Sequence, residues 1–353
     1  MRVLPLHEEE WEYVQTLLPS DLEESARTSG ALLRCRNVPN AGALLRMALA
    51  YGVSDLSLKD VAAWASSLQV AEISGPGLFY RLREAEGWLE HVLAAALAEG
   101  VATTTAAWPV RVVDATVING PGDKAVQWRA HVWINPATGG FRRVELTDDS
   151  GGEKLGRHVI ERGEVILGDR AYATARGLYA VRRAGAHAVV RFTPANLRTC
   201  DEQRQRTYLM EYEVQVPAVG AVEFNITIPV PPKPTKSHKI WKSSRAIDWI
   251  SARAIAARTR SGEVFWIVTT LDAAELPTLQ VMALYRLRWQ IELLFKRLKS
   301  LLHLDTLPSR QGPTAKSWML ARLIAAALAQ RLVQPSGPLS PWGYELRPAA
   351  THA

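Results

Sequence analysis

Tyr285-Arg-Leu-Arg-Trp-Gln-Ile-Glu-Leu-Leu-Phe-Lys-Arg-Leu-Lys299 is the stretch that decides the fold class of this chain. It contains no Gly or Pro and is rich in residues that favour helices, so it predicts a helix that begins near Thr278. At about 100° per residue, such a helix has two distinct faces. One face is apolar and comprises Leu284, Leu287, Ile291, Leu294, Leu298 and Leu302. The other comprises Tyr285, Arg288, Glu292, Lys296 and Lys299, with Trp289 at its edge.

The polar face of this predicted helix is open to two interpretations. Glu292 could pair with Arg288 or Lys296 on a solvated surface, as on most charged helices. However, the cations outnumber the acid, and aromatic residues accompany them. This combination suits a nucleic-acid backbone lying beside a metal-bound carboxylate.

Four residues of this face match a known signature. Tyr285, Arg288, Glu292 and Lys299 have the spacing Tyr-x2-Arg-x3-Glu-x6-Lys, so the chain resembles DDE transposases of the insertion-sequence-4 (IS4) family from about residue 20 to 333. The resemblance implies cut-and-paste DNA transposition, in which terminal inverted repeats are bound, cleaved and transferred to target DNA. It also requires two aspartates upstream, each on a strand.

The sequence supplies both aspartates in suitable places. Asp114 lies within the β-branched segment 110–118, and Asp169 follows the short apolar segment 164–168. Further strands are predicted at 127–134 and 140–146, and a short helix at 153–160. Alone, Asp114 could be an edge-strand acid or part of a salt bridge. The order of strand, strand, strand, helix, strand resembles an RNase H-like fold, in which the two aspartate-bearing strands are neighbours.

By this resemblance, Asp114, Asp169 and Glu292 are the catalytic residues and the metal ligands. Carboxylates are hard oxygen ligands suited to two Mg²⁺ ions, for which Mn²⁺ may substitute. Asp114 would contact both ions, and Asp169 and Glu292 one each. The resemblance also implies that Tyr285, Arg288 and Lys299 grip phosphates. Lys296 is a further candidate, while Trp289 is expected to pack against the sheet rather than to stack on a base.

The expected fold class is α/β, with an RNase H-like catalytic core interrupted by a β-rich insertion and preceded by an all-helical N-terminal domain. The predicted parts are a helical DNA-binding domain at 1–105, the first part of the core at 106–193, the insertion at 194–262, the second part of the core at 263–333 and a tail at 334–353.

The N-terminal part predicts helices at 7–18, 20–29, 40–51, 58–66 and 76–99. The helix after Ser57, a turn through 73–77 and an Arg-bearing second helix could form a helix-turn-helix DNA reader. The residues that would face DNA are Lys59, Tyr80, Arg81 and Arg83. Spacing alone favours an ordinary packed helix pair, whereas the resemblance favours DNA binding, because such transposases use their N-terminal domain on the element's ends.

The segment between the second aspartate and the signature helix alternates in type. A helix at 174–184, strands at 187–193, 208–216, 221–230 and 263–270, and a final helix at 315–333 are predicted. The loop 231–245 is rich in lysine, and Lys239 and Lys242 are candidate DNA-binding residues if the loop lies near the site. Otherwise it is a solvated surface loop.

The composition fits a DNA-acting protein. The 353 residues carry a net charge of +7, and the pI of about 9.5 favours a polyanionic partner. The two cysteines, Cys35 and Cys200, form no CxxC and no zinc spacing, so reduced thiols are expected. The histidines His91, His131, His187 and His238 show no ligand spacing. No signal peptide or membrane span is evident, so a cytoplasmic, nucleoid-associated location is expected.

The expected partner is double-stranded DNA, both inverted repeats and target, bound by a homodimer on paired ends. Two alternatives belong to other classes. One is an inactive regulator or relic that binds inverted repeats without cutting, against which the intact Asp114, Asp169 and Glu292 argue. The other is a metal-dependent nuclease of RNase H-like fold, against which the signature spacing argues.

Overall fold

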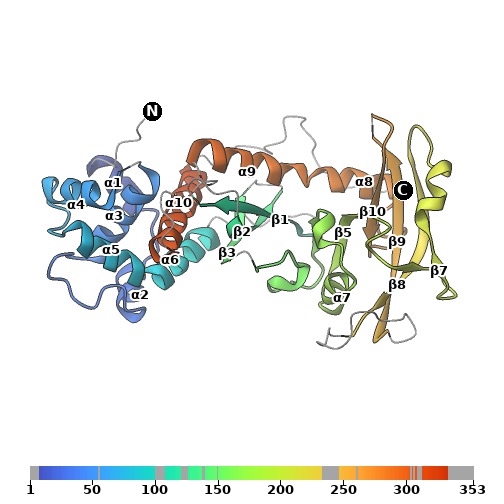
Figure 1. Cartoon of the computed structure of the whole chain (residues 1–353), viewed down its shortest axis with the longest axis horizontal. Coiled ribbons are helices and arrows are strands. Elements are labelled where there is room, and N and C mark those ends of the chain that lie inside the picture. The colour runs from blue at the N-terminus through green and yellow to red at the C-terminus, as the bar shows by residue number, and fades with distance from the viewer. Residues whose placement is uncertain are drawn as a thin grey trace, which may run out of the picture.

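The computed structural model describes residues 8–54, 56–99, 108–120, 126–136, 140–148, 150–232, 246–259, 261–302, 304, 307 and 312–332. The molecule is elongated, with a group of helices at one end and a long sheet running to the other (Figure 1). The predicted loop lysines Lys239 and Lys242 and the tail after 333 lie outside these residues, as do parts of the predicted linker and hairpin turn.

Residues 8–99 form helices and no strand in the part that the structure describes. The helices are α1 (Glu8–Gln15), α2 (Leu22–Thr28), α3 (Ala41–Val53), α4 (Leu58–Ser67), α5 (Gly75–Glu84) and α6 (Glu86–Glu99). Short polar side chains cap three of them. Asn40 accepts from the Ala43 amide, Ser74 accepts from the Gly77 amide, and Ser57 forms a capping box with Asp60.

The prediction of a single helix at 76–99 is wrong, because the helix is interrupted at Ala85, between α5 and α6. The change of direction buries both Leu82 of α5 and Trp88 of α6 in one core. Gly75-Pro-Gly77, predicted as a turn, is instead the first turn of α5, where a proline is well tolerated. The α4–α5 pair therefore has a second helix of only 10 residues.

The sheet has ten strands in the order β3-β2-β1-β4-β5-β10-β9-β8-β6-β7. Strands β1, β4 and β5 are parallel, and the other pairs are antiparallel. The bounds are β1 Val110–Asn119, β2 Val126–Asn135, β3 Gly140–Asp148, β4 Val165–Gly168, β5 His187–Phe192, β6 Thr199–Cys200, β7 Arg206–Thr207, β8 Ala221–Val230, β9 Asp248–Arg258 and β10 Val264–Thr269. The adjacency predicted for the two aspartate-bearing strands, β1 and β4, is confirmed.

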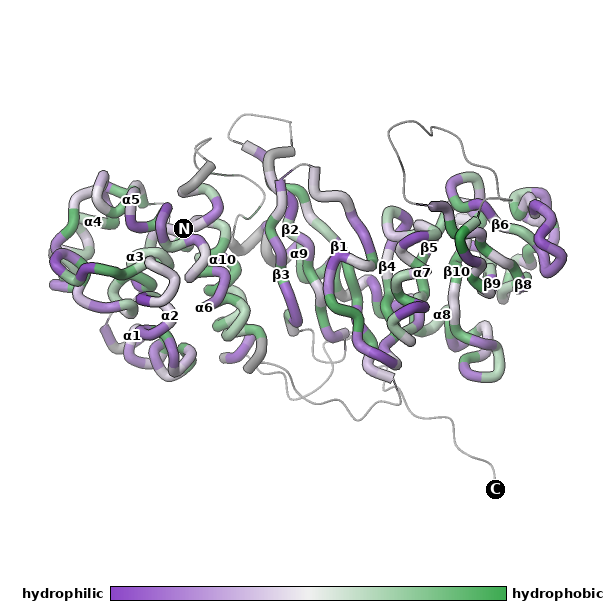
Figure 2. The backbone as a smooth tube through the Cα atoms, turned by 90° about the horizontal axis from the view of Figure 1, so that it is seen from below, coloured by the Kyte–Doolittle hydropathy of each residue, from purple (hydrophilic) through white to green (hydrophobic). Residues whose placement is uncertain are grey.

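Two layers of helix cover the central strands. Helices α8 (Thr278–Arg286) and α9 (Trp289–Leu302) run along one side of the sheet, and α7 (Ala175–Arg183) lies on the other (Figures 1 and 2). Both faces of β1 are therefore apolar, with Val112 and Ile118 in the core under α9 and Val113 in the core on the α7 side. A strand buried on both faces is the usual condition of a parallel sheet.

Two predicted elements of the catalytic half take a different form. The helix predicted at 153–160 is only a 3₁₀ turn, η1 (Leu155–Arg157), after the pair Gly151-Gly152. The strand predicted at 208–216 is a 3₁₀ helix, η3 (Leu209–Gln215). There Arg258 donates to the carbonyls of Glu213 and Val216, which replaces a neighbouring strand as hydrogen-bond partner.

Strand β9 was not predicted, and it joins β8 to β10 within one continuous sheet. The strands of segment 194–262 thus extend the central sheet, as Figure 2 shows. None of the described helices is long and apolar enough to span a membrane.

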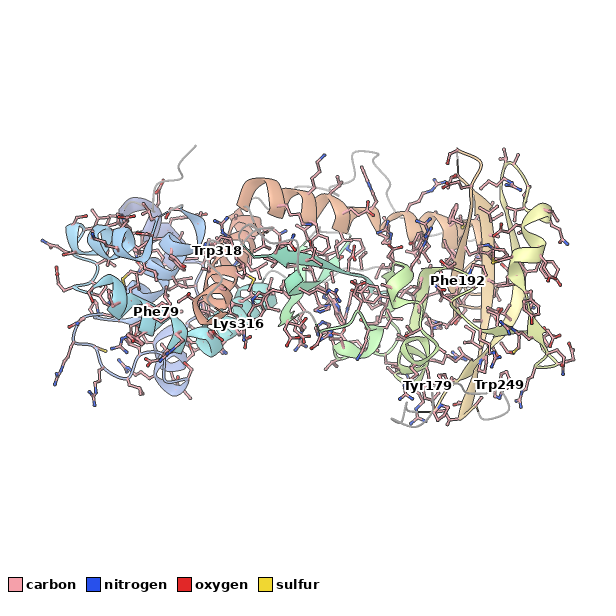
Figure 3. All side chains as sticks on the ribbon, viewed as in Figure 1. Phe79, Tyr179, Phe192, Trp249, Lys316 and Trp318 are labelled. Atoms are coloured by element: carbon pink, nitrogen blue, oxygen red, sulfur yellow. The ribbon has the colours of Figure 1, made fainter. Side chains whose placement is uncertain are left out.

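The last helix, α10 (Gly312–Leu332), packs mainly against α3 and α6 of the N-terminal part. Lys316 Nζ lies 2.8 Å from a Glu90 carboxylate oxygen, and Trp318 is buried at the same junction (Figure 3). At the crossing, a Cβ atom on Gly52 of α3 would lie 2.6 Å from the Cβ of Ala321. The absence of a side chain at residue 52 lets the two helices approach, so one core continues from the helices into the sheet.

We predict that Gly52→Ala lowers the free energy of unfolding by about 1–3 kcal/mol, because the added methyl group forces α3 and α10 apart. Gly87→Ala is the matched control, since a Cβ atom there meets nothing within 4 Å. It should be neutral or stabilising by up to about 1 kcal/mol. Urea denaturation of both variants tests this, and equal effects of the two substitutions would contradict the close packing.

Candidate active site

Asp114 within β1 and Asp169 directly after β4 lie level with each other, because β1 and β4 are neighbouring parallel strands. The last backbone pair between β1 and β4 joins Val112 to Leu167, and each aspartate follows its paired residue by two positions. Since side chains alternate along a strand, both carboxylates belong to the face that carries Val112 and Leu167, which is the face under α9. The two carboxylates therefore lie on one face of the sheet, beside the carboxyl end of β4.

The charge on Asp114 is poorly compensated. Burial raises the pKa of its carboxyl to about 6. The Ala115 amide, which donates to Oδ1 at 2.8 Å, lowers this pKa. Arg288 lowers this pKa, whereas Glu153 and Asp169 raise it. Asp169 Oδ1 is buried and has no hydrogen-bond partner among the described residues. The pair of carboxylates is thus arranged as a site of concentrated negative charge.

The signature stretch lies over this pair as two helices rather than the single helix predicted. At the junction of α8 and α9, the amides of Leu287 and Arg288 donate to the carbonyls of Leu284 and Tyr285, three residues back, which tightens the turn. The apolar face is confirmed at Leu284, Ile291 and Leu294, which are buried. The side chains of Leu298 and Leu302 lie outside the described residues.

Arg288 is the link between the helix and the aspartates. Its Nη2 donates to Glu292 Oε1 at 2.6 Å, and its side chain is 13% exposed against 45% for Glu292. The guanidinium carbon lies 5.8 Å from the centre of the Tyr285 ring. Burial raises the pKa of Tyr285. Arg288 lowers this pKa, and Asp169 raises it. The structure therefore brings Asp114, Asp169, Tyr285 and Arg288 together, with Glu292 at the rim.

The acidic residues are not drawn into a tight cluster. Within the described part of the chain, no three Asp, Glu, His or Cys side chains stand close enough to form a ready-made metal site. Glu292 instead faces Arg288.

Comparison with known proteins identifies the family. The family described as "Transposase DDE domain" matches residues 108–328. The putative transposase InsL for insertion sequence element IS186A of Escherichia coli K12 is 34% identical over 343 residues, which cover 90% of this chain and 92% of the relative. The transposase for insertion sequence element IS421 of Escherichia coli is 34% identical with the same coverage.

This chain belongs to the DDE transposase family. The resemblance to IS4-family transposases is confirmed, and the protein is an enzyme of DNA cleavage and strand transfer. Among solved structures, the piggyBac transposase synaptic complex with hairpin DNA aligns with a TM-score of 0.46 and 9% identity, over 81% of this chain and 63% of that one.

The other predicted positions of the transposase vary in their exposure. Lys296 is exposed and Lys299 is half-buried on α9, whereas Lys239 and Lys242 lie outside the described residues. Trp289 is 46% exposed, so the expectation that it packs against the sheet is wrong. The short turn between α8 and α9 leaves this ring on the outside.

The candidate DNA-facing residues of α4 and α5 are mostly on the surface. Tyr80 is 54% exposed, with the Arg83 guanidinium 5.1 Å from its ring centre, and Lys59 is also exposed. Arg81 instead donates to the carbonyl of Arg34 at 3.0 Å. This contact ties α5 to the loop between α2 and α3.

The two cysteines and the described histidines of the sequence analysis have surroundings away from Asp114 and Asp169, and His238 lies outside the described residues. Cys35 is exposed, Cys200 is buried, and both are free. His91 lies 2.8 Å from Asp21, and His131 hydrogen-bonds to Thr147. His187 lies 3.3 Å from the carbonyl of Thr270.

Sequence reasoning missed Glu153, which acts on the pKa values of Asp114 and of the buried Tyr172. Two arginines were also missed. Arg129 lowers the pKa of Glu153, and Arg191 lowers the pKa of Tyr285. The one available signal was the pair of glycines before Glu153, which marks a tight approach of backbone.

We predict that Asp114→Asn stabilises the transposase in EDTA at pH 8 by on the order of 2 kcal/mol, since the raised pKa means that the charged carboxylate is unfavourable when folded. The wild-type protein has the stability contributed by protonated Asp114 below pH 4, and loses it as the pH rises through about 6. The gain should therefore vanish near pH 4.

The exposed Asp148 is the control, because hydrogen bonding by Ser150 lowers the pKa of its carboxyl. Asp148→Asn should bring no gain at pH 8. A loss of stability in Asp114→Asn at pH 8, measured by chemical denaturation, would contradict the unfavourable burial of its charge.

Proposed function

We propose that this transposase performs metal-dependent cut-and-paste transposition: it cleaves DNA at the terminal inverted repeats of its own element and joins the freed ends to target DNA. The observation that carries the proposal is the level placement of Asp114 and Asp169 beneath the Tyr285–Arg288 turn. Asp114, Asp169 and Glu292 are proposed as the catalytic residues and the metal ligands.

The residues suit divalent cations. Carboxylate oxygens are the ligands that Mg²⁺ prefers, and Mn²⁺ accepts the same donors. Asp169 Oδ1 is buried without a partner, so a cation would supply the missing interaction. We propose two Mg²⁺ ions, with Asp114 contacting both and Asp169 and Glu292 one each. When bound, such ions activate the attacking water or 3′-hydroxyl and stabilise the leaving oxygen.

Arg288 connects DNA binding to the assembly of this site. In the free protein its guanidinium neutralises Glu292. A scissile phosphate offers the same planar fork a second, more strongly charged acceptor. Transfer of Arg288 from Glu292 to the phosphate would release Glu292 to turn towards Asp114 and Asp169. The protein then contributes positioning and charge, which is most of what phosphoryl transfer requires.

Other groups would hold the DNA. Tyr285, Lys296 and Lys299 share the face of Arg288 and are proposed to contact phosphates near the cut. Lys239 and Lys242, which lie between β8 and β9 in the sequence, are also proposed to contact DNA. The α4–α5 pair, with Lys59, Tyr80 and Arg83 on its surface, is the proposed reader of the inverted repeat.

The strand order of the sheet supports the proposed function. The run β3-β2-β1-β4-β5, with β1, β4 and β5 parallel, is the arrangement expected of an RNase H-like core. We propose that 106–193 and 263–333 form this core, that 194–262 is the β-rich insertion and that 1–105 is the helical DNA-binding domain. A homodimer on two paired ends, in the nucleoid, is the proposed working form.

We predict that Glu292→Gln retains binding to a duplex with the element's own end but lowers its Mg²⁺-dependent cleavage at least 100-fold, because the amide is a poor cation ligand. Gel shift and end-labelled cleavage assays separate the two effects. Cleavage at the wild-type rate would remove Glu292 from the catalytic residues.

We predict that Arg288→Ala weakens end binding and makes the logarithm of the affinity fall less steeply with the logarithm of salt concentration, by about one unit of slope. Arg286→Ala is the matched control, since Arg286 is exposed at the end of α8 and lies off the signature face. If both variants change the slope equally, the phosphate role of Arg288 is wrong.

A further inference from the structure

Arg191 of β5 continues the row of charged side chains that begins with Asp114 and Asp169. The backbone register aligns three buried residues across the parallel strands β1, β4 and β5: Val112, Leu167 and Val189. Each of them is followed, two positions later, by one of the three charged residues. Since side chains alternate along extended backbone, Arg191 belongs to the same face of the sheet as the aspartates. Neighbouring strands are about 4.8 Å apart, so Arg191 stands one strand away from Asp169.

The side chain of Arg191 is half-buried, and its Nε is buried without a hydrogen-bond partner in the described part of the chain. The same is true of Asp169 Oδ1 on the adjacent strand. The two charged groups therefore do not satisfy each other, although their strands are neighbours. A buried polar atom without a partner is unfavourable and marks a place where another group binds.

Helix α8 and the turn after it bring two more such atoms to this face of the sheet. Helix α8 packs against β5, and both Tyr285 Oη and Arg288 Nε are buried without a partner among the described residues. Glu292 accepts only from Nη2 of Arg288, which leaves Nε unsatisfied. Burial raises the pKa of Tyr285, whereas Arg288 and Arg191 lower it, so both guanidinium groups lie near its hydroxyl.

The unsatisfied atoms next to Asp169 are of one chemical kind. The Nε atoms of Arg191 and Arg288 are cationic donors, and the hydroxyl of Tyr285 is a neutral donor. A ligand that satisfies all of them must be an anion with several acceptor oxygens, which describes a phosphodiester. The planar guanidinium also matches the geometry of phosphate better than an ammonium group does. These donors therefore suit a phosphate bound between the sheet and the turn.

We propose that Arg191 binds a phosphate of the DNA end from the side of the sheet, opposite Arg288. This inference rests on the proposed function, which places the DNA end beside Asp114 and Asp169. Arg191 lies outside the signature stretch, on a strand that is paired on both sides, with β4 and with β10. It would thus be a fixed contact, whereas Arg288 can exchange Glu292 for the phosphate. Two arginines from different elements would hold the strand in line with the aspartates.

The test measures binding of the full-length protein to a duplex with the element's own end, by gel shift in EDTA at several salt concentrations. Arg191→Gln should weaken binding about tenfold or more, as loss of a charge-assisted hydrogen bond does, and should lower the salt slope by about one unit. Arg191→Lys keeps the charge without the fork, so it should keep the slope and only part of the affinity. Arg182→Gln is the matched control, because Arg182 is exposed on α7, across the sheet from the aspartates, and should change neither.

Substitution of single phosphates distinguishes this role from a structural one. Uncharged methylphosphonates are placed one at a time around the element boundary. One position should weaken binding by the wild type and by Arg191→Lys but have no effect on Arg191→Gln, because the charge that it answers is gone. A structural role would lower the affinity of Arg191→Gln and leave its response at every position like that of the wild type.

That second pattern, or unchanged affinity in Arg191→Gln, would overturn the inference about Arg191. If Arg191→Gln does not fold, Arg191→Lys decides, and wild-type affinity in this variant would overturn the inference. Failure of the wild-type protein to bind the element's end would instead overturn the proposed function.

Discussion

The proposed active site of this transposase depends on holding two carboxylates near each other, on the neighbouring parallel strands β1 and β4 inside the sheet. Asp114 and Asp169 repel each other, and burial of Asp114 adds a desolvation cost that raises its pKa to about 6. The fold tolerates this because β1 and β4 are held on both faces by apolar cores, from Val112 and Leu167 on one side to Val113 and Ile166 on the other. The stability of the sheet thus supports a locally unfavourable site.

The helices over the site combine two tasks in one short sequence. Leu284, Ile291 and Leu294 anchor α8 and α9 to the sheet, while Tyr285 and Arg288 face the aspartates from the same turn. At its far end α9 meets α10, and α10 packs against α3 and α6. The packing at Gly52 and Ala321 therefore joins the N-terminal helices and the site through one apolar core.

Strong local patterns made much of this arrangement predictable from the sequence. The β-branched run around Asp114, the apolar run before Asp169 and the two-faced stretch from Tyr285 to Lys299 each dictated its element, and the signature spacing identified the family. The interruption at Leu287 carried no Gly or Pro to reveal it, since it is a tightening of the hydrogen bonds by one residue. Tertiary contacts decided such positions.

The remaining errors have the same origin. Strand β9 is rich in alanine and arginine, a composition without strand preference, and is a strand because β8 and β10 pair with it on both sides. Segment 208–216 alternates like a strand, yet Arg258 fixes it as a 3₁₀ helix. Glu153 could not be placed from sequence, because its position depends on Arg129 and Arg157, which hold the glycines before it from other elements.

The most direct test of the central claim is cleavage of a labelled duplex that carries the element's own end, in Mg²⁺ and in EDTA, by the wild type and by Asp169→Asn. The account predicts cuts at the element boundary that require Mg²⁺ and disappear in Asp169→Asn, with end binding retained. Boundary cuts that persist in EDTA or in Asp169→Asn, or tight end binding without any cut in Mg²⁺ or Mn²⁺, would contradict it.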